Sequence, residues 1–404
     1  AQRPFEPQRM MYGRVESASG EILDEVLAVF MPGPHSYTRE DVAEIHCHGG
    51  EIAAQRVLRR VIGLGARAAG PGEFTRRAFL NGRIDLSRAE AVMQLIGATS
   101  EAAARASIRQ LEGGVTGFVR AASDRLIQML SLIEACTDFP DEVEEQATAE
   151  ALLSGISALK AELSRRCDPK SARILREGAS IVLAGRPNVG KSSLMNALLR
   201  QERAIVTSVP GTTRDVLTER ISIGGVRAEL SDTAGQRETD DPVERIGVCR
   251  AENAMERADI VLIVLDGSGE ITPQDRALLD KADARAIVCL NKCDLPEAGC
   301  DVPGALRLSA LTGAGVDALT EAIAHRLSAA RPTDDCLTEQ RHIALARAAC
   351  AALERAICAL DGGFELDVTA IDLMAALKAL CEITGEDASE EVIDRVFSNF
   401  CVGK

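Results

Sequence analysis

The feature that most constrains the fold is a glycine-rich loop between an apolar run and a helical run. Residues 181–184 are apolar, residues 185–192 have the sequence Gly-Arg-Pro-Asn-Val-Gly-Lys-Ser, and a helical pattern continues to Leu199. Glycines let a backbone wrap closely around a phosphate, and the following helix presents the positive end of its dipole. The loop therefore predicts a phosphate site in a mostly parallel α/β sheet. A chance glycine-rich turn is the alternative, but the flanking strand and helix argue against it.

The loop also predicts how the phosphates are held. Lys191 is expected to reach the β- and γ-phosphates of a nucleotide, and the Ser192 hydroxyl is expected to bind Mg²⁺. The residues of this loop predicted to contact the nucleotide are Asn188, Val189, Gly190, Lys191, Ser192 and Ser193.

A second motif, Asn-Lys-Cys-Asp at 291–294, follows the apolar run 286–290 and indicates which base is bound. An aspartate accepts two hydrogen bonds from the N1–H and N2–H₂ groups of guanine. Adenine offers no such pair of donors, and a buried carboxylate left without partners is costly. A surface turn is the alternative for four residues taken alone, but their position after a strand and downstream of the loop favours GTP. The residues predicted to form the base pocket are Asn291, Lys292, Asp294, Ser309, Ala310 and Leu311.

Two further segments are expected on the γ-phosphate side. Thr213 is the predicted second Mg²⁺ ligand, Asp232 is expected to hold the metal through water, and the Gly235 backbone is expected to sense the γ-phosphate. Segments that contact only the triphosphate are natural switches. The predicted nucleotide contacts here are Thr207, Ser208, Val209, Pro210, Gly211, Thr212, Thr213, Asp232, Thr233, Ala234 and Gly235.

The patterns along the 404 residues predict several domains. Residues 1–79 mix short apolar runs with glycine and proline turns and predict a small α/β domain. Residues 80–172 and 332–404 are rich in helix formers and predict helices. Residues 173–331 alternate β-rich and helical runs, which is typical of a mostly parallel sheet with helices on both faces. The simplest arrangement inserts the domain of residues 173–331 into the helical one.

Within the helical segments, four stretches have few helix breakers and are expected to be helical. They are residues 89–111, 149–165, 341–360 and 372–400.

Composition excludes several classes of protein. The hydrophobic fraction is 46%, and no run approaches the roughly eighteen apolar residues that cross a membrane. Twelve cysteines are scattered without a paired Cys-x-x-Cys spacing, which favours a reducing cytoplasm and no structural metal site. We therefore expect a soluble, cytoplasmic protein.

The net charge of −15 argues against a general nucleic-acid binder, so that any RNA contact must be local. Between residues 56 and 88, eight arginines accompany only two acidic residues, Glu73 and Asp85. A solvated surface and a local RNA contact are both open interpretations of this stretch. The arginines are Arg56, Arg59, Arg60, Arg67, Arg76, Arg77, Arg83 and Arg88.

Three segments together resemble those of the translation-factor-related GTPases: Gly-Arg-Pro-Asn-Val-Gly-Lys-Ser-Ser at 185–193, Gly-Thr-Thr-Arg-Asp at 211–215 and Asp-Thr-Ala-Gly at 232–235. The sequence outside these segments resembles one family more specifically, the tRNA-modification GTPase family MnmE. The similarity covers nearly the whole chain. The segments that carry the narrower resemblance are Pro-Gly-Glu-Phe-Thr-Arg-Arg-Ala-Phe-Leu-Asn-Gly-Arg-Ile-Asp-Leu at 71–86, Ala-Glu-Ala at 89–91 and Phe-Cys-Val-Gly-Lys at 400–404.

The resemblance implies a fold and a reaction. It implies a P-loop GTPase domain inserted into a helical domain, preceded by a small α/β domain that binds folate and dimerises. It further implies a homodimer that works with an FAD-dependent partner protein, as a heterotetramer, to modify C5 of the wobble uridine in certain tRNAs. The one-carbon unit would come from 5,10-methylene- or 5-formyl-tetrahydrofolate.

The resemblance also implies an ion and a catalytic residue in the GTP site. Potassium would be bound by Asn188, Thr207, Val209 and Thr212, where a cation beside the phosphates can replace an arginine finger. In the alternative, Asn188 is only a spacer. Glu244 would act through water in GTP hydrolysis, although a solvated glutamate is the alternative there. Gln236 directly follows Asp-Thr-Ala-Gly, as the water-positioning glutamine does in Ras-like enzymes, and is a second candidate.

For folate, the family pattern maps onto Glu44, Arg83 and Lys404. Arg83 stands where a lysine is common, which preserves the charge but changes the geometry. The glycine- and arginine-containing segment expected near the family's N-terminus is missing, so the first domain is expected to begin partway. The resemblance places the C-terminal tail, with Cys401 as a third catalytic candidate, beside the folate pocket. Prenylation of Cys401 is excluded, because Gly403 and Lys404 do not fit the motif.

Two other classes of function remain open. A ribosome-assembly GTPase would share the nucleotide motifs but should carry a second GTPase domain or an RNA-binding module, and the sequence contains neither. A non-catalytic scaffold gated by the nucleotide would bind GTP with slow or absent turnover.

Overall fold

A computed structural model describes residues 6–139, 144–201, 218–232, 253–296, 302–329 and 336–400. The chain separates into two compact units. The first contains residues 1–96, 107–161 and 345–404, and the second contains residues 97–106 and 162–344. The domain boundaries expected from the sequence stay predictions. No helix among the described residues is long and apolar enough to cross a membrane.

The second unit is built on a six-stranded sheet with the order β5-β6-β4-β7-β8-β9. The β5–β6 pair is antiparallel and the other neighbours are parallel. The strands β4 and β7 are apolar and buried along almost their whole length, as expected for parallel strands covered on both faces. The strands are β4 (Ala179–Ala184), β5 (Thr218–Ile223), β6 (Val226–Asp232), β7 (Ile260–Asp266), β8 (Ala286–Asn291) and β9 (Leu306–Arg307).

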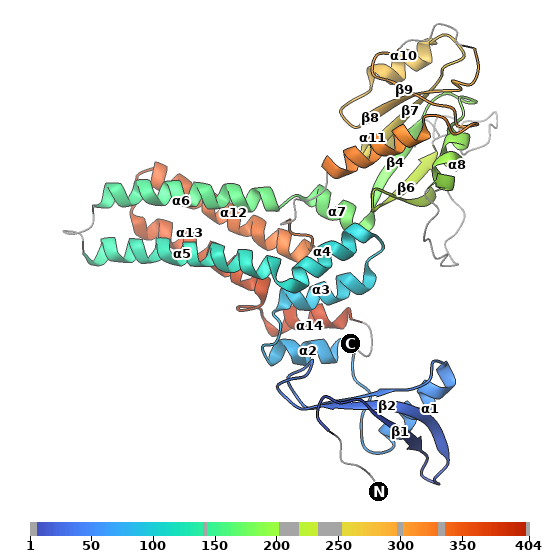
Figure 1. The fold of residues 1–404 in the computed structure, drawn as a ribbon. Helices are drawn as coiled ribbons and strands as arrows, with labels where there is room; N and C mark the ends of the chain where they lie inside the picture. The colour runs from blue at the N-terminus through green and yellow to red at the C-terminus, as the bar shows by residue number, and fades with distance from the viewer. Residues whose placement is uncertain are drawn as a thin grey trace, which may run out of the picture. The chain divides into compact units, whose positions relative to one another are not determined.

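Helices α8, α10 and α11 lie beside the strands of this sheet (Figure 1), and alternate residues of the strands pack into two separate cores. Ile181 and Leu183 of β4 pack with α8 (Lys191–Gln201) and α11 (Val316–Ala329). Val182 and Ala184 point to the opposite face, in the core that includes α10 (Pro273–Asp280). A strand with both faces buried cannot slip by one residue without exchanging its two cores, so the register of β4 is well determined.

The helix α7 (Pro169–Glu177) leads into β4, and Asp168 caps its first turn. Arg173 of α7 donates to both carboxylate oxygens of the buried Asp259, at 2.5 and 2.7 Å. The same carboxylate accepts from the Ser180 N–H at 2.9 Å. This buried charge is therefore paired and hydrogen-bonded, as a buried carboxylate must be.

The first unit begins with a three-stranded antiparallel sheet in the order β1-β2-β3. Its elements are β1 (Met11–Glu16), β2 (Ile22–Met31), β3 (Val42–His46) and α1 (Glu51–Ile62).

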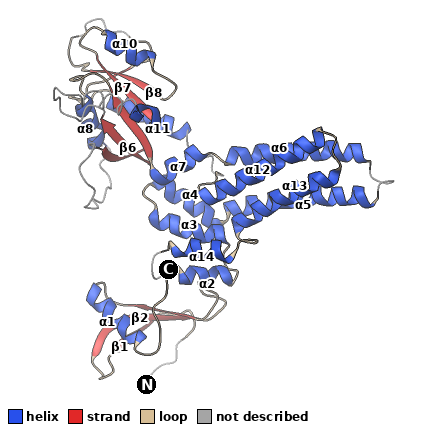
Figure 2. Ribbon diagram, turned by 180° about the vertical axis from the view of Figure 1, so that it is seen from behind, coloured by secondary structure: helices blue, strands red, loops and turns tan. Residues whose placement is uncertain are grey.

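The remainder of the described first unit is helical (Figure 2). The long helices α5, α6, α12 and α13 lie side by side in both views, and α5 packs along α13. Phe79, Phe397 and Phe400 pack around the buried Leu86 and join α2, α3 and α14. The helices are α2 (Glu73–Leu80), α3 (Leu86–Gly97), α4 (Glu101–Glu112), α5 (Gly114–Asp138), α6 (Glu145–Arg166), α12 (Gln340–Asp361), α13 (Leu366–Thr384) and α14 (Glu390–Ser398). Of these, α3, α4, α6 and α12 each have residues in both units.

Of the four stretches expected to be helical, residues 149–165 lie within α6 and residues 341–360 lie within α12, whereas the other two each contain a break. In residues 89–111 the break separates α3 from α4, where the Ser100 hydroxyl accepts from the Ala103 N–H. In residues 372–400, α13 ends at Gly385 with a φ of 88°, and Ser389 caps α14. A glycine with a positive φ ends a helix, and an N-cap serine begins the next one, even where a helical pattern lies on both sides of the break.

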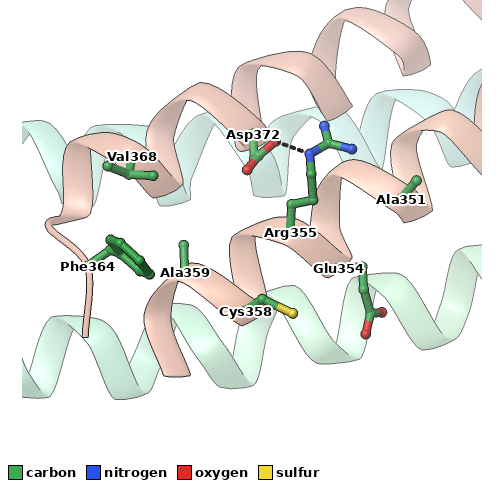
Figure 3. Close-up of a pocket in the computed structure, with 8 residues that line it drawn as sticks. All are labelled: Ala351, Glu354, Arg355, Cys358, Ala359, Phe364, Val368 and Asp372. Carbon is green, nitrogen blue, oxygen red and sulfur yellow. Dashed lines mark hydrogen bonds and ion pairs between the residues drawn. The ribbon is translucent and has the colours of Figure 1, made fainter. Parts of the chain in front are cut away.

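A groove crosses the surface between α12 and α13 (Figure 3). Its lining is largely apolar and includes Ala359, Phe364 and Val368. Arg355 donates to Asp372 across it at 2.8 Å. The one basic residue in its lining, Arg355, is paired with Asp372, and the largely apolar lining does not suit a nucleotide.

Candidate nucleotide site

The described nucleotide segments meet at one edge of the six-stranded sheet. The strand β4 lies inside the sheet, between β6 and β7. The strands β5 and β6 lie on one side of it, and the later strands β7, β8 and β9 lie on the other. A crevice outside the carboxyl end of such a central strand is the usual ligand site of an open α/β sheet. The loop 185–190 leaves β4 at this edge, and Asp232 and Asn291 end β6 and β8 there.

The glycines of the loop are required by close contacts. At Gly190 the φ is 97°, and an added Cβ would overlap the Asn291 side-chain amide. At Gly185 an added Cβ would overlap the Val264 carbonyl oxygen. The loop therefore lies directly against β7 and the residue that ends β8.

We predict that Gly190→Ala abolishes nucleotide binding while Gly269→Ala does not. The Gly190 φ strains any L-residue by about 1–3 kcal/mol, and the new methyl displaces the Asn291 amide, whereas an added Cβ at Gly269 meets no atom within 4 Å. Titration with a fluorescent GDP measures both variants. Wild-type affinity in Gly190→Ala would contradict the geometry of the loop.

Lys191 is held in place by the loop that it follows. Its Nζ donates to the carbonyl oxygens of Gly185 at 2.8 Å and Arg186 at 2.9 Å, and the residue is only 4% exposed. Burial lowers the pKa of the ammonium group, and the nearby Asp232 carboxylate opposes that change. A buried cation of this kind gains from further anionic partners, and nucleotide phosphates would supply them.

Ser192 and Asp232 fit a Mg²⁺ site. The Ser192 hydroxyl donates to Asp232 Oδ2 at 2.9 Å, which brings a hydroxyl and a carboxylate together beside the loop. Such hard oxygen ligands suit Mg²⁺, which takes its other ligands from phosphates and water. The described residues contain no group of three or more His, Cys, Asp or Glu side chains that could hold a metal alone.

Asn291 joins the base-recognition loop to the phosphate loop. Its Nδ2 donates to the Val189 carbonyl oxygen at 2.8 Å, and its Oδ1 accepts from the Ala310 N–H at 2.9 Å. The side chain is 2% exposed, so both ends of its amide are satisfied in the interior. The Ser309 hydroxyl donates to Asp294 Oδ1 at 2.5 Å and accepts from the Thr312 N–H. These bonds position the carboxylate predicted to read the base.

Asp266 is a member of this site that the sequence reasoning missed. It ends β7, and its Oδ2 accepts from Lys292 Nζ at 2.6 Å. Burial raises the pKa of Asp266, but hydrogen bonds from Lys292 and Ser268 outweigh burial and lower it overall. Its position at the end of a buried strand, beside the ends of β4 and β8, was the available signal.

The described part of the site contains thirteen of the predicted nucleotide residues. Leu311 is largely exposed and follows the Ser309–Ala310 backbone. The predicted residues outside the described chain are Thr207, Ser208, Val209, Pro210, Gly211, Thr212, Thr213, Thr233, Ala234, Gly235, Gln236, Glu244, Cys401 and Lys404.

The structure gives the two described folate candidates other partners. Glu44 lies on the exposed strand β3, with His46 Nε2 3.4 Å from its carboxylate. The Arg83 guanidinium lies 4.7 Å from the centre of the Tyr37 ring. A guanidinium over an aromatic ring is a stabilising stack and also a common ligand platform.

The arginines between residues 56 and 88 are largely neutralised. Arg67 and the Gly70 N–H, in that order, lower the pKa of Glu73 to about 2. Arg76 pairs with Asp394 and Arg56 pairs with Glu21, both acids from outside the stretch. These pairs favour the solvated-surface interpretation over an RNA contact.

Two family models match the chain and together cover nearly all of it. The model described as the MnmE helical domain matches residues 86–401. The model described as the GTP-binding protein TrmE N-terminus matches residues 1–83.

Similar proteins carry the same family name. A tRNA modification GTPase MnmE of Symbiobacterium thermophilum is 44% identical over 429 aligned positions, covering 100% of this chain and 93% of the relative. One of Synechococcus sp. (strain CC9605) is 47% identical, covering 98% of this chain and 89% of the relative. Among solved structures, a variant of Aquifex aeolicus Era bound to GDP.AlF4⁻ is 25% identical, with a TM-score of 0.30, over 43% of this chain and 66% of that chain.

Proposed function

This chain belongs to the tRNA modification GTPase family MnmE, and on that premise we propose that it hydrolyses GTP to GDP and phosphate in the modification of tRNA. One observation carries the nucleotide part of the proposal. The buried Lys191, the Ser192–Asp232 pair and the Asn291–Asp294 loop converge at one sheet edge. Phosphate, metal and guanine each find a chemically matched group there.

Each described residue has a part in binding. Lys191, already fixed by two carbonyl oxygens, donates to the β- and γ-phosphates. Ser192 would bind Mg²⁺ directly and Asp232 would hold it through water, and the ion would neutralise phosphate charge. Asp294 accepts from guanine N1–H and N2–H₂, while Asn291 ties the base loop to the phosphate loop.

The chemical step needs residues outside the described chain. Thr213 supplies the second hydroxyl to Mg²⁺, and Gly235 contacts the γ-phosphate through its backbone. Glu244 orients the attacking water through a second water, and Gln236 assists. The family pattern supports the assignment of Glu244. Members of the family usually have an apolar residue where Gln236 stands, so the part of Gln236 is supported only by its position directly after Asp-Thr-Ala-Gly.

Potassium completes the proposed site, bound by Asn188, Thr207, Val209 and Thr212. Asn188 has a φ of 62° and its side chain is exposed at the loop, which leaves it accessible to an ion. A monovalent cation there places positive charge beside the phosphates, where charge develops in the transition state.

We predict that potassium accelerates GTP hydrolysis and favours pairing of two GTPase domains in the triphosphate state. Sodium is smaller and fits poorly among ligands spaced for potassium, so the rate in sodium stays near the basal value. Phosphate release at equal ionic strength in the two salts measures the effect. Equal rates would remove Asn188 from the site.

The tRNA part of the proposal rests on the family. The chain acts as a homodimer with an FAD-dependent partner, in a heterotetramer, and modifies C5 of the wobble uridine. The folate one-carbon unit is bound near Glu44, Arg83 and Lys404, and Cys401 takes part in the modification. The Arg83–Tyr37 stack supports a folate site, since a pterin ring could join it.

We predict that deletion of residues 401–404 separates the two activities. GTP binding and intrinsic hydrolysis should stay nearly unchanged, because the nucleotide residues all lie between 185 and 311. Modification of tRNA in the reconstituted system should be lost. Full modification by the shortened chain would assign the tail a structural part only.

A further inference from the structure

Arg186, the second residue of the phosphate loop, makes two different contacts. Its carbonyl oxygen accepts from Lys191 Nζ at 2.9 Å. Its side chain reaches away from the loop, and Nε donates to Asp275 Oδ1 of α10 at 2.9 Å. One residue thus joins the phosphate-binding lysine to a helix on the other side of the loop.

Asp275 divides its two oxygens between two tasks. Oδ2 accepts from the N–H and the hydroxyl of Thr272, at 3.0 and 2.7 Å, and thereby caps α10. Oδ1 accepts from Arg186. Asp275 is 2% exposed. The cap of α10 uses only one of its oxygens, so capping alone does not explain why the buried carboxylate also pairs with an arginine.

The charges around Arg186 favour this pairing. Burial raises the pKa of Asp275, but the hydrogen bonds from Arg186 and Thr272 outweigh burial and lower it. The hydrogen bond to Asp275 raises the pKa of Arg186, and the nearby Asp266 adds to that rise. Asp266 is the carboxylate that pairs with Lys292, so the base loop borders the same cluster.

Side chains from two elements outside the phosphate loop contact it and fix its conformation. Asn291 at the end of β8 holds the Val189 carbonyl group, and Asp275 of α10 holds the Arg186 side chain. Between them the chain turns through Asn188, which has a φ of 62°. Without these contacts a short loop with a left-handed residue would sample other conformations.

We infer that Asp275 is a positioning residue for nucleotide binding: through Arg186 it fixes the carbonyl oxygen on which Lys191 rests, and so places the ammonium group for the β-phosphate. This inference rests on the proposed function, since it requires that the loop bind GTP. Preorganisation of this kind strengthens binding because the loop loses less freedom when the ligand arrives.

The test compares Asp275→Asn and Arg186→Met with Thr272→Ala. Asparagine keeps an oxygen for the helix cap but removes the charge that faces Arg186. Arg186→Met removes the other member of the Arg186–Asp275 ion pair, at a partly exposed position. Thr272→Ala weakens the cap of α10 and leaves the Arg186–Asp275 pair intact. The measurements are competition binding of GDP and GMP, and thermal unfolding without nucleotide.

Asp275→Asn and Arg186→Met should each weaken GDP binding about tenfold, the scale of one charge-assisted hydrogen bond. Binding of GMP, which has no β-phosphate for Lys191, should change little. The double variant should lose no more than either single variant, because both remove one interaction. Thr272→Ala should lower the unfolding temperature and leave the GDP-to-GMP affinity ratio at its wild-type value.

Unchanged GDP affinity in Arg186→Met, or equal losses for GDP and GMP, would overturn the inference. So would additive losses in the double variant. If the wild-type chain bound no GDP, the proposed function itself would fail, and the two failures are thereby distinguishable.

Discussion

Asp294→Asn should change the preferred base from guanine to xanthine. The carboxylate is proposed to accept from two guanine donors, whereas the asparagine amide can donate to the carbonyl oxygen that replaces the guanine amino group. A hydrogen bond to a charged group contributes about 1.5–3 kcal/mol, so GDP affinity should fall at least about tenfold and affinity for xanthosine diphosphate should rise. Competition binding of both nucleotides to both proteins measures the change.

The gain of xanthosine binding serves as the control in this experiment. A misfolded variant would lose both nucleotides, but only an intact pocket can gain one. The Ser309 hydroxyl, which donates to the Asp294 carboxylate, can also donate to the asparagine oxygen. An unaltered preference for GDP would show that Asp294 does not contact the base.

Glu244→Ala should lose most of the GTPase turnover and keep the affinity for GTP. A residue that acts only in the transition state lowers the rate without weakening ground-state binding. Proton transfer and water positioning of this kind contribute about 100-fold or more. The rate of phosphate release at saturating GTP, in potassium, measures the loss.

Gln236→Ala is the matched comparison for Glu244→Ala, since both residues are proposed to act on the same water. Its turnover should fall less. The reverse order would assign the catalytic part to Gln236. Wild-type turnover in both variants would remove both residues from the mechanism.

The sequence predicted the elements of the nucleotide site because each carries a local signal. The apolar runs at 181–184 and 286–290 became buried strands, and each is followed by its motif at the same sheet edge. Parallel strands covered on both faces have long apolar runs, so their positions are visible in the sequence.

The contacts between motifs could not be predicted in the same way. The Asn291–Val189 and Arg186–Asp275 hydrogen bonds join residues 102 and 89 positions apart. Such pairs depend on which strands become neighbours in the sheet, and no local pattern encodes that. The same limit applies to Arg76, whose acidic partner Asp394 lies near the other end of the chain.

The sequence contains local signals for both helix breaks, but the helical pattern on either side of each break is the stronger signal. Ser100 and Ser389 are ordinary helix caps, and Gly385 is an ordinary helix end. The helical pattern resumes after both breaks, and a periodic apolar pattern on either side does not distinguish one long helix from two.

Calorimetric titration of the full chain with GDP and with ADP, in Mg²⁺ buffer, tests the central claim most directly. The loop at 185–192 should bind either diphosphate through Lys191 and Ser192, so the base loop decides between them. The predicted result is saturable binding of one GDP per chain and no measurable binding of ADP. Equal affinity for the two nucleotides would contradict the account.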